Sequence, residues 1–176
     1  MAISIEFLTA ENANSLQRLI DDMGLGKDSG YVQRCVDKSE DKSEGKNGDS
    51  ERITLLAHWG GDLVGFCILN FRPAYAPFYR FSIPEFQDLN THPDHRRKGV
   101  AAALIDECER LARERGANAL GLGVGLHAGY GNAQRLYVKK GYVPDGQGVV
   151  YDAQGVKPYD IRPVDDELCL MMVKSI

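Results

Sequence analysis

The chain has 176 residues, a length that suits one domain with a sizeable core. Its formal net charge of −4 disfavours a general nucleic-acid binder, which needs a broad basic field to meet the phosphate backbone. No basic segment followed by an apolar stretch stands near Met1, and no apolar run reaches the roughly 18–20 residues that cross a bilayer. We therefore expect a cytoplasmic protein with no nucleic-acid or membrane partner.

The cysteines are scattered through apolar segments and show no CxxC spacing. We therefore expect reduced core residues and no metal site. They are Cys35, Cys67, Cys108 and Cys169.

The first part of the chain predicts a strand, two helices and a hairpin. "ISIEFL" alternates like a strand, and apolar residues at helical spacing follow in 13–20, with Gly24 as the stop. A short second helix is expected over 31–36. Residues 38–52 carry nine charges and no apolar side chain, which predicts a mobile loop. "ITLLAHW" and "LVGFCILNF", joined by glycines, then predict a β-hairpin.

The second part predicts a strand in "PEFQDLNTH" and a long amphipathic helix over 99–115, ended by Gly116. "ALGLGVGLH" alternates strictly, which places its glycines on one strand face, where a neighbour can come close. "NAQRLYVKKG" predicts a short helix ended by Gly141, and "GVVYD" and "ELCLMMVK" predict the last two strands. We expect these elements to form one domain over 1–176.

Three cations and a glycine stand directly before the long helix, with the spacing Arg96-x-x-Gly99-x-Ala101. Unpaired N–H groups at a helix N-terminus attract an anion, and a glycine lets phosphates approach the backbone. The turn therefore predicts a diphosphate site, with a solvated loop before a helix as the alternative. Neither a GxxxxGK[ST] nor a GxGxxG pattern is present, which points to another kind of nucleotide-containing ligand.

Residues 53–141 resemble the GCN5-related N-acetyltransferase (GNAT) superfamily, whose pyrophosphate loop has the form Gln/Arg-x-x-Gly-x-Gly/Ala. "RRKGVA" fits this form, and the hairpin, strand, loop, long helix, strand and "AQRLYVKKGY" follow in the family's order. The resemblance implies an α/β fold of the α+β type. Its mixed, mostly antiparallel central sheet would have six or seven strands and about four flanking helices, with the fourth and fifth strands splayed apart.

The resemblance also implies acetyl-CoA as the acyl donor, with no metal. The pantetheine arm would bind the backbone of the strand before the basic turn, and the diphosphate would bind the turn itself. The residues implied in CoA binding are Leu89, Asn90, Thr91, Arg96, Arg97, Lys98, Gly99, Val100, Ala101, Ala133 and Tyr137.

Tyr137 matches the family pattern Ala-x-x-x-Tyr-x-x-x-Gly-Phe/Tyr, which implies a general acid for the departing thiolate. A core aromatic on an amphipathic helix is the alternative. The family frequently has Asn seven residues before this Tyr, but here that position is Tyr130 and the nearest Asn is Asn132. Either Asn132 caps the helix or the preceding loop is remodelled, so we assign Asn132 no role in CoA binding.

Glu85 is the first candidate for the general base, because some family members carry a base at this distance before the basic turn. Strand alternation places Glu85 and Asp88 on opposite faces unless a bulge intervenes, so Asp88 is also a candidate. His127, most simply a capped residue at a strand end, and a water are the remaining alternatives. Each carboxylate could also be a polar surface or turn residue.

The expected activity is direct transfer of acetyl from acetyl-CoA to a primary amine of a small molecule or peptide in a ternary complex. The backbone N–H of Leu89 would donate to the developing oxyanion. The alternative is a non-catalytic acyl-CoA-binding module that serves as a sensor or scaffold. The expected partners are acetyl-CoA and the amine acceptor, and the protein would be a monomer or homodimer.

Overall fold

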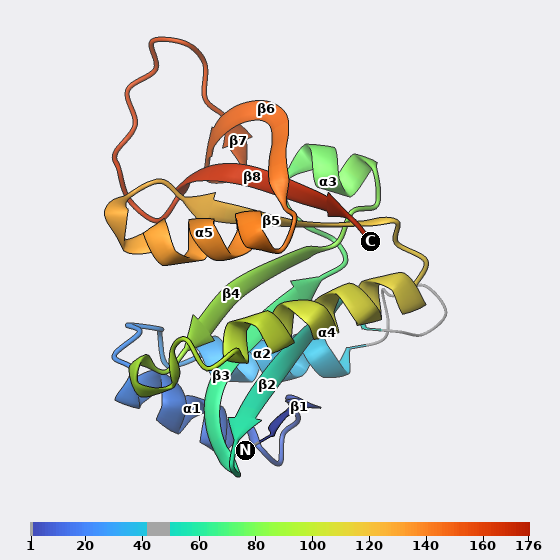
Figure 1. Cartoon of the computed structure of the whole chain (residues 1–176), viewed down its shortest axis with the longest axis vertical. Helices are drawn as coiled ribbons and strands as arrows, with labels where there is room; N and C mark the ends of the chain where they lie inside the picture. Colours follow the sequence, from blue (N-terminus) through green and yellow to red (C-terminus); the bar gives the residue numbers. More distant parts are fainter. Residues whose placement is uncertain (1, 42–49) are drawn as a thin grey trace. The chain divides into compact units, whose positions relative to one another are not determined.

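The computed structural model describes residues 2–41 and 50–176 and divides into two compact units, Met1–Phe71 with Phe86–Arg110, and Arg72–Glu85 with Leu111–Ile176 (Figure 1). The first unit holds β1 (Ile3–Phe7), α1 (Ala13–Asp22), α2 (Tyr31–Glu40), β2 (Arg52–Trp59), β3 (Asp62–Asn70), nearly all of β4 (Glu85–Thr91), a 3-10 helix (Pro93–His95) and most of α4 (Val100–Glu114). The second holds α3 (Ala76–Arg80), β5 (Ala119–Gly125), a 3-10 helix (Ala128–Tyr130), α5 (Gly131–Lys139), β6 (Val143–Tyr151), β7 (Gln154–Gly155) and β8 (Leu168–Ser175).

Strand alternation in the first unit sends neighbouring side chains of β3 to opposite faces. Phe66 and Ile68 join a buried cluster with apolar residues of α1 and α2. Cys67, between them in the chain, has its Sγ 3.5 Å from the Sγ of Cys108 in α4. Helices α1 and α2 therefore cover one face of these strands, and α4 covers the other (Figure 1).

The predicted hairpin is β2 and β3, which pair antiparallel. Gly60 and Gly61 turn the chain with φ of +64° and +101°, in the left-handed region that glycine adopts without a steric penalty. The cysteines are free thiols, and three of them, Cys35, Cys67 and Cys108, are buried as expected.

In the second unit β8 lies between β5 and β6 and is antiparallel to both. A β-carbon on Gly121 would collide with the Phe78 ring, and one on Gly125 would collide with the Tyr130 ring. Two of the three glycines on this face thus lie against aromatic rings of the chain itself, and the third, Gly123, lies against Met171. Phe78 belongs to α3, which packs on β6 and β8 through a small apolar cluster.

Strand β4 begins in the second unit, where Glu85 pairs in parallel with Gly121 of β5. This one residue pair is the whole parallel pairing of β4 with β5. The predicted mixed, mostly antiparallel α/β architecture is confirmed. Within the described residues there are eight strands, more than the six or seven expected, and the strand that was not predicted is β7. Helix α3 was not predicted either and adds to the four expected helices.

The segment 38–52, predicted to be a mobile loop, is described only at its ends. Residues 38–40 belong to α2, and Arg52 begins β2. Ser50 is buried, and its Oγ lies 2.6 Å from the carbonyl oxygen of Lys38. Residues 42–49 lie outside the described residues. Mobility of the loop and a single domain over 1–176 both stay predictions.

Candidate active site

Strand β4 changes backbone conformation in its middle, at Asp88. The φ of Asp88 is +50°, in the left-handed region that residues other than glycine rarely adopt. The Asn90 Nδ2 donates a hydrogen bond of 2.9 Å to the carbonyl oxygen of Asp88. Regular alternation of side chains along β4 is therefore interrupted at this residue, as a bulge would do.

Two side chains from the connection of α1 to α2 and from the start of α2 contact the Asp88 carboxylate. Lys27 Nζ lies 2.7 Å from Oδ1, and the Tyr31 hydroxyl donates to Oδ2 over 2.7 Å. Burial and the Asp88 charge raise the pKa of Tyr31 well above its usual range, so the hydroxyl keeps its proton. Each carboxylate oxygen thus has one partner from this segment of the chain.

Glu85, the other carboxylate candidate, is the first residue of β4 and is only 7% exposed. It lies in the second unit, where it pairs with Gly121. Burial, with the charges of Glu167 and Glu85, raises the pKa of the Cys169 thiol to about 11. Its burial distinguishes Glu85 from Asp88, whose side chain is 29% exposed.

The basic turn lies between the 3-10 helix and α4 in the first unit. Arg97 and Gly99 adopt φ of +61° and +90°, and Arg96, Arg97 and Lys98 are exposed. Apart from its neighbours in the chain, a β-carbon built on Gly99 would have one described atom within 4 Å, Ile3 Cδ1 at 3.7 Å. Helix α4 begins at Val100, so cations, free space and first-turn N–H groups meet at its N-terminus.

Leu89, Asn90 and Thr91 are half-buried and end β4 ahead of this turn. The Thr91 Oγ1 is buried and has no hydrogen-bond partner among the described residues. Val100, at the head of α4, is buried, whereas Ala101 is half-buried. All nine residues predicted from the strand and turn to bind CoA therefore lie in the first unit.

Tyr137 and Ala133, the remaining two, lie on α5 in the second unit. Tyr137 is only 7% exposed and meets the ring of Tyr142 edge-on, with ring centres 6.4 Å apart. Its burial is compatible with both the acid and the core-aromatic interpretation.

Asn132 does not cap α5. The helix begins at Gly131, and the capping position is Tyr130, which makes no side-chain hydrogen bond to the helix end. Asn132 is exposed in the first turn. The cap interpretation is therefore wrong, and the loop before α5 instead forms the 3-10 helix Ala128–Tyr130.

His127 caps that 3-10 helix. The Gly129 N–H donates to Nδ1 over 3.1 Å, so the proton of a neutral ring lies on Nε2, 2.9 Å from Asp166 Oδ1. The Tyr130 hydroxyl donates to the same carboxylate oxygen. Both ring nitrogens are engaged, which leaves His127 no free lone pair with which to act as a base.

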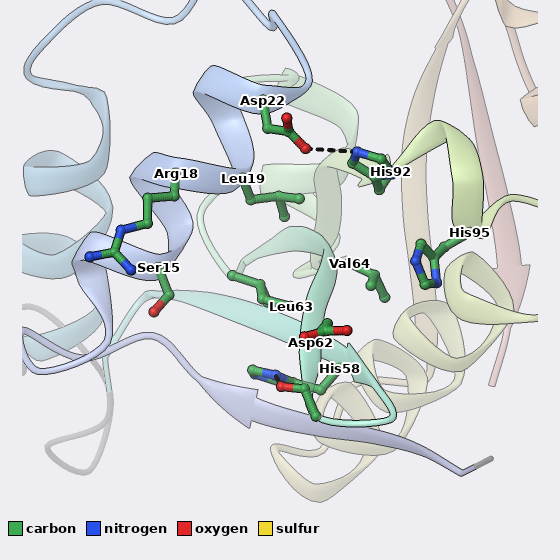
Figure 2. A pocket seen from close by; sticks show the side chains of 11 residues that line it. Ser15, Arg18, Leu19, Asp22, His58, Asp62, Leu63, Val64, His92 and His95 are labelled. Atoms are coloured by element: carbon green, nitrogen blue, oxygen red, sulfur yellow. Dashed lines mark hydrogen bonds and ion pairs between the residues drawn. The ribbon is translucent and has the colours of Figure 1, made fainter.

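A separate open groove of about 680 Å³ lies in the first unit, lined by residues of α1, the β2–β3 hairpin and the segment after β4 (Figure 2). Figure 2 shows His92 and Asp22 joined across it, with 2.9 Å between Nε2 and Oδ2. His58 at its other end lies 2.9 Å from the Glu6 carboxylate. None of the residues predicted to bind CoA or to act in catalysis lines this groove.

Among residues 2–41 and 50–176, no group of three or more His, Cys, Asp or Glu side chains could hold a metal ion. No helix of this described part is long and apolar enough to cross a membrane.

Lys27 and Tyr31 are the site residues that sequence reasoning missed. They lie 61 and 57 residues before Asp88 in the chain, and neither belongs to a recognisable motif. No local pattern could have linked them to β4.

The sequence model of the acetyltransferase (GNAT) family matches residues 19–142. Streptothricin acetyltransferase from Streptomyces lavendulae is 35% identical to the chain over 85 residues, which cover 48% of this chain and 41% of that protein. The chain thus matches less than half the length of this relative.

Solved structures share the fold at low sequence identity. The ribosomal-protein-alanine N-acetyltransferase of Brucella melitensis has a TM-score of 0.68 and 18% identity, with 98% of this chain and 99% of that chain covered. The PaiA N-acetyltransferase of Thermoplasma acidophilum, solved in complex with coenzyme A, has a TM-score of 0.60 and 18% identity over the whole of both chains. Since the family match extends over more than half of the chain, this protein belongs to the acetyltransferase (GNAT) family.

Proposed function

We propose that the protein transfers an acetyl group from acetyl-CoA to a primary amine by direct attack in a ternary complex. The observation that carries this proposal is the head of α4, where a basic turn with left-handed residues stands before a helix N-terminus. The family match and the coenzyme A complex of a structural relative support the same donor.

The residues of the turn fit a diphosphate. A β-carbon at Gly99 would meet almost no protein atom, so phosphates could approach the backbone there. Arg96, Arg97 and Lys98 are exposed and would balance the phosphate charge. The backbone groups of Leu89, Asn90 and Thr91 would hold the pantetheine arm, and Val100, Ala101 and Ala133 would complete the CoA site.

Acetyl-CoA would supply an acyl group activated as a thioester. The acceptor nitrogen forms a bond to the acyl carbon, and the carbon–sulfur bond breaks. Leu89 N–H would donate to the developing oxyanion, Tyr137 would protonate the departing thiolate, and a base would take the proton that the amine releases.

Of the two carboxylates, we assign the base to Glu85. Asp88 already contacts Lys27 and Tyr31 through both oxygens, whereas Glu85 is the more buried of the two.

The names of two relatives support two classes of amine as candidate acceptors. Streptothricin acetyltransferase is named for a small molecule, and the Brucella melitensis relative is named for an alanine of a ribosomal protein. We therefore propose a primary amine on a small molecule or on a peptide as the acceptor.

A panel of both amine classes, with thiol release from acetyl-CoA and mass spectrometry of the products, tests the proposal. An acetylated amine formed in step with free thiol is the expected result. Binding of CoA without thiol release from any amine would instead identify a non-catalytic acyl-CoA-binding module.

A further inference from the structure

We propose that Lys27 and Tyr31 are positioning residues, which hold Asp88 in its left-handed conformation and so orient the N–H of Leu89 toward the reacting carbonyl. This inference rests on the proposed function, because it concerns the N–H that we assign to the oxyanion. We call Lys27, Tyr31, Asp88 and Asn90 the Asp88 clamp.

The clamp engages three acceptor atoms of Asp88. Lys27 Nζ and the Tyr31 hydroxyl each lie 2.7 Å from one carboxylate oxygen, and Asn90 Nδ2 lies 2.9 Å from the carbonyl oxygen. Lys27 Nζ also lies 4.8 Å from the centre of the Tyr31 ring, so the two donors support each other. The Asp88 side chain is thereby fixed from two directions.

Fixing Asp88 fixes the neighbouring N–H because the two belong to one rigid group. The carbonyl of Asp88 and the N–H of Leu89 form a single planar peptide unit. The Asn90 hydrogen bond holds the oxygen of this unit, and the Asp88 side chain holds the residue whose ψ sets its orientation. An aspartate with φ of +50° persists only where its surroundings stabilise that conformation.

The clamp also balances charge next to the proposed oxyanion. A bare carboxylate at Asp88 would repel negative charge that develops near the Leu89 N–H. The ammonium of Lys27 neutralises it, and the side chains of Lys27 and Asp88 are only 26% and 29% exposed, so solvent screens the pair incompletely. Lys27 therefore has an electrostatic role beside its geometric one.

The opposing interpretation makes Asp88 the general base. Lys27 and Tyr31 would then compete with the substrate proton for the carboxylate oxygens, so removing either donor should leave turnover unchanged or raise it. The clamp predicts the reverse, because removing either donor should lower turnover and leave the acid limb of the pH–rate profile where it is.

The test compares Lys27→Met, Tyr31→Phe, Asp88→Asn and Asp88→Ala in the full chain with one accepted amine. Lys27→Met and Tyr31→Phe should each lower kcat by about tenfold. This loss is smaller than the roughly 10²–10³-fold loss that follows complete removal of an oxyanion donor, because each variant only misorients the Leu89 N–H. The CoA affinity by calorimetry should fall by less than kcat, because the basic turn that would hold the diphosphate is untouched. Asp88→Asn should keep much of the activity that Asp88→Ala loses, because asparagine tolerates the left-handed region and can still accept hydrogen bonds.

Arg34→Gln is the matched control. Arg34 is on α2 and pairs with Asp28 over 2.6 Å, in the same segment as Lys27 and Tyr31, and both side chains are largely exposed. This change breaks an ion pair of the same segment without touching β4, so kcat should remain that of the wild type.

Two results obtained with an active wild type would overturn the clamp. One is an unchanged kcat in both Lys27→Met and Tyr31→Phe with an active wild type, which leaves the proposed function standing. The other is equal inactivity of Asp88→Asn and Asp88→Ala together with a shifted acid limb in Lys27→Met, which would make Asp88 the base. A wild type that binds CoA but acetylates no amine would remove the proposed function and the clamp together.

Discussion

Replacing Gly99 by alanine separates the ligand-binding role of this residue from its backbone role. Gly99 has φ of +90°, and Gly116, just beyond the other end of α4, has φ of +81°. Among the described residues beyond the chain neighbours, a β-carbon on Gly99 would meet Ile3 Cδ1 at 3.7 Å, and one on Gly116 would meet no atom within 4 Å, so neither substitution creates a clash there. Gly116→Ala is therefore a control with the same backbone strain and no bearing on the diphosphate.

The structure sets the expected magnitudes. An alanine in the left-handed region costs about 1–2 kcal/mol, so both variants should lose a similar amount of stability. For a chain of this length each kcal/mol lowers Tm by about 2–4 °C. Only Gly99→Ala should also weaken CoA binding, by at least about tenfold, or about 1.4 kcal/mol, because its methyl group would take the space in front of the α4 N-terminus.

Calorimetric titration with CoA and thermal unfolding without ligand measure the two effects separately. The reasoning fails if Gly99→Ala binds CoA as tightly as Gly116→Ala does. It also fails if the two variants lose CoA affinity in parallel, since the loss would then follow stability and not the site.

Three further predictions concern single side chains. Gly121→Ala should cost about 1–3 kcal/mol of unfolding free energy, because the new methyl collides with the buried Phe78 ring. Gly123→Ala on the same strand face should cost less, because its methyl meets the flexible end of Met171 at 3.2 Å and Cys169 Cβ at an ordinary contact distance of 3.7 Å; equal stabilities of the two variants in urea would contradict this. Tyr137→Phe should lower kcat by about 10–10⁴-fold with KM for acetyl-CoA little changed, and a near-normal kcat with chemistry limiting turnover would leave Tyr137 as a core aromatic. Burial and the hydrogen bond that the Tyr75 hydroxyl donates to the Asp145 carboxylate hold the pKa of Tyr75 above its usual range. The folded chain thus keeps a proton that the unfolded chain loses near pH ~10, so stability should fall as pH rises above ~10, and Tyr75→Phe should make that fall less steep.

Most of the architecture follows from periodicity in the sequence. Alternating residues identify the two faces of β3, and helical spacing identifies α1, α4 and α5, because each of these elements buries one side. Helix α3 escaped prediction because its five residues, Ala76–Arg80, complete too few turns to show a period. Strand β7 was not predicted because its two residues are too few to show an alternating pattern.

The sequence identifies the basic turn but not the reason for its conformation. The spacing from Arg96 to Ala101 marks a helix start with phosphate-binding character, and Gly99 is the expected left-handed residue. The left-handed φ of Arg97 has no local signal, because arginine seldom adopts it. Such torsions are imposed by the closure of the turn between the 3-10 helix and α4.

The choice between Glu85 and Asp88 shows why a catalytic base is hard to assign from sequence. The two carboxylates are three residues apart on one strand, and their intrinsic acidity is nearly the same. Their environments separate them, because Glu85 is buried at the first residue of β4, whereas Asp88 receives Lys27 and Tyr31 from a distant part of the chain. A substituted base should lose activity whatever the replacement, whereas a clamped aspartate should tolerate asparagine better than alanine. Comparing amide and alanine substitutions at both positions therefore assigns the two roles.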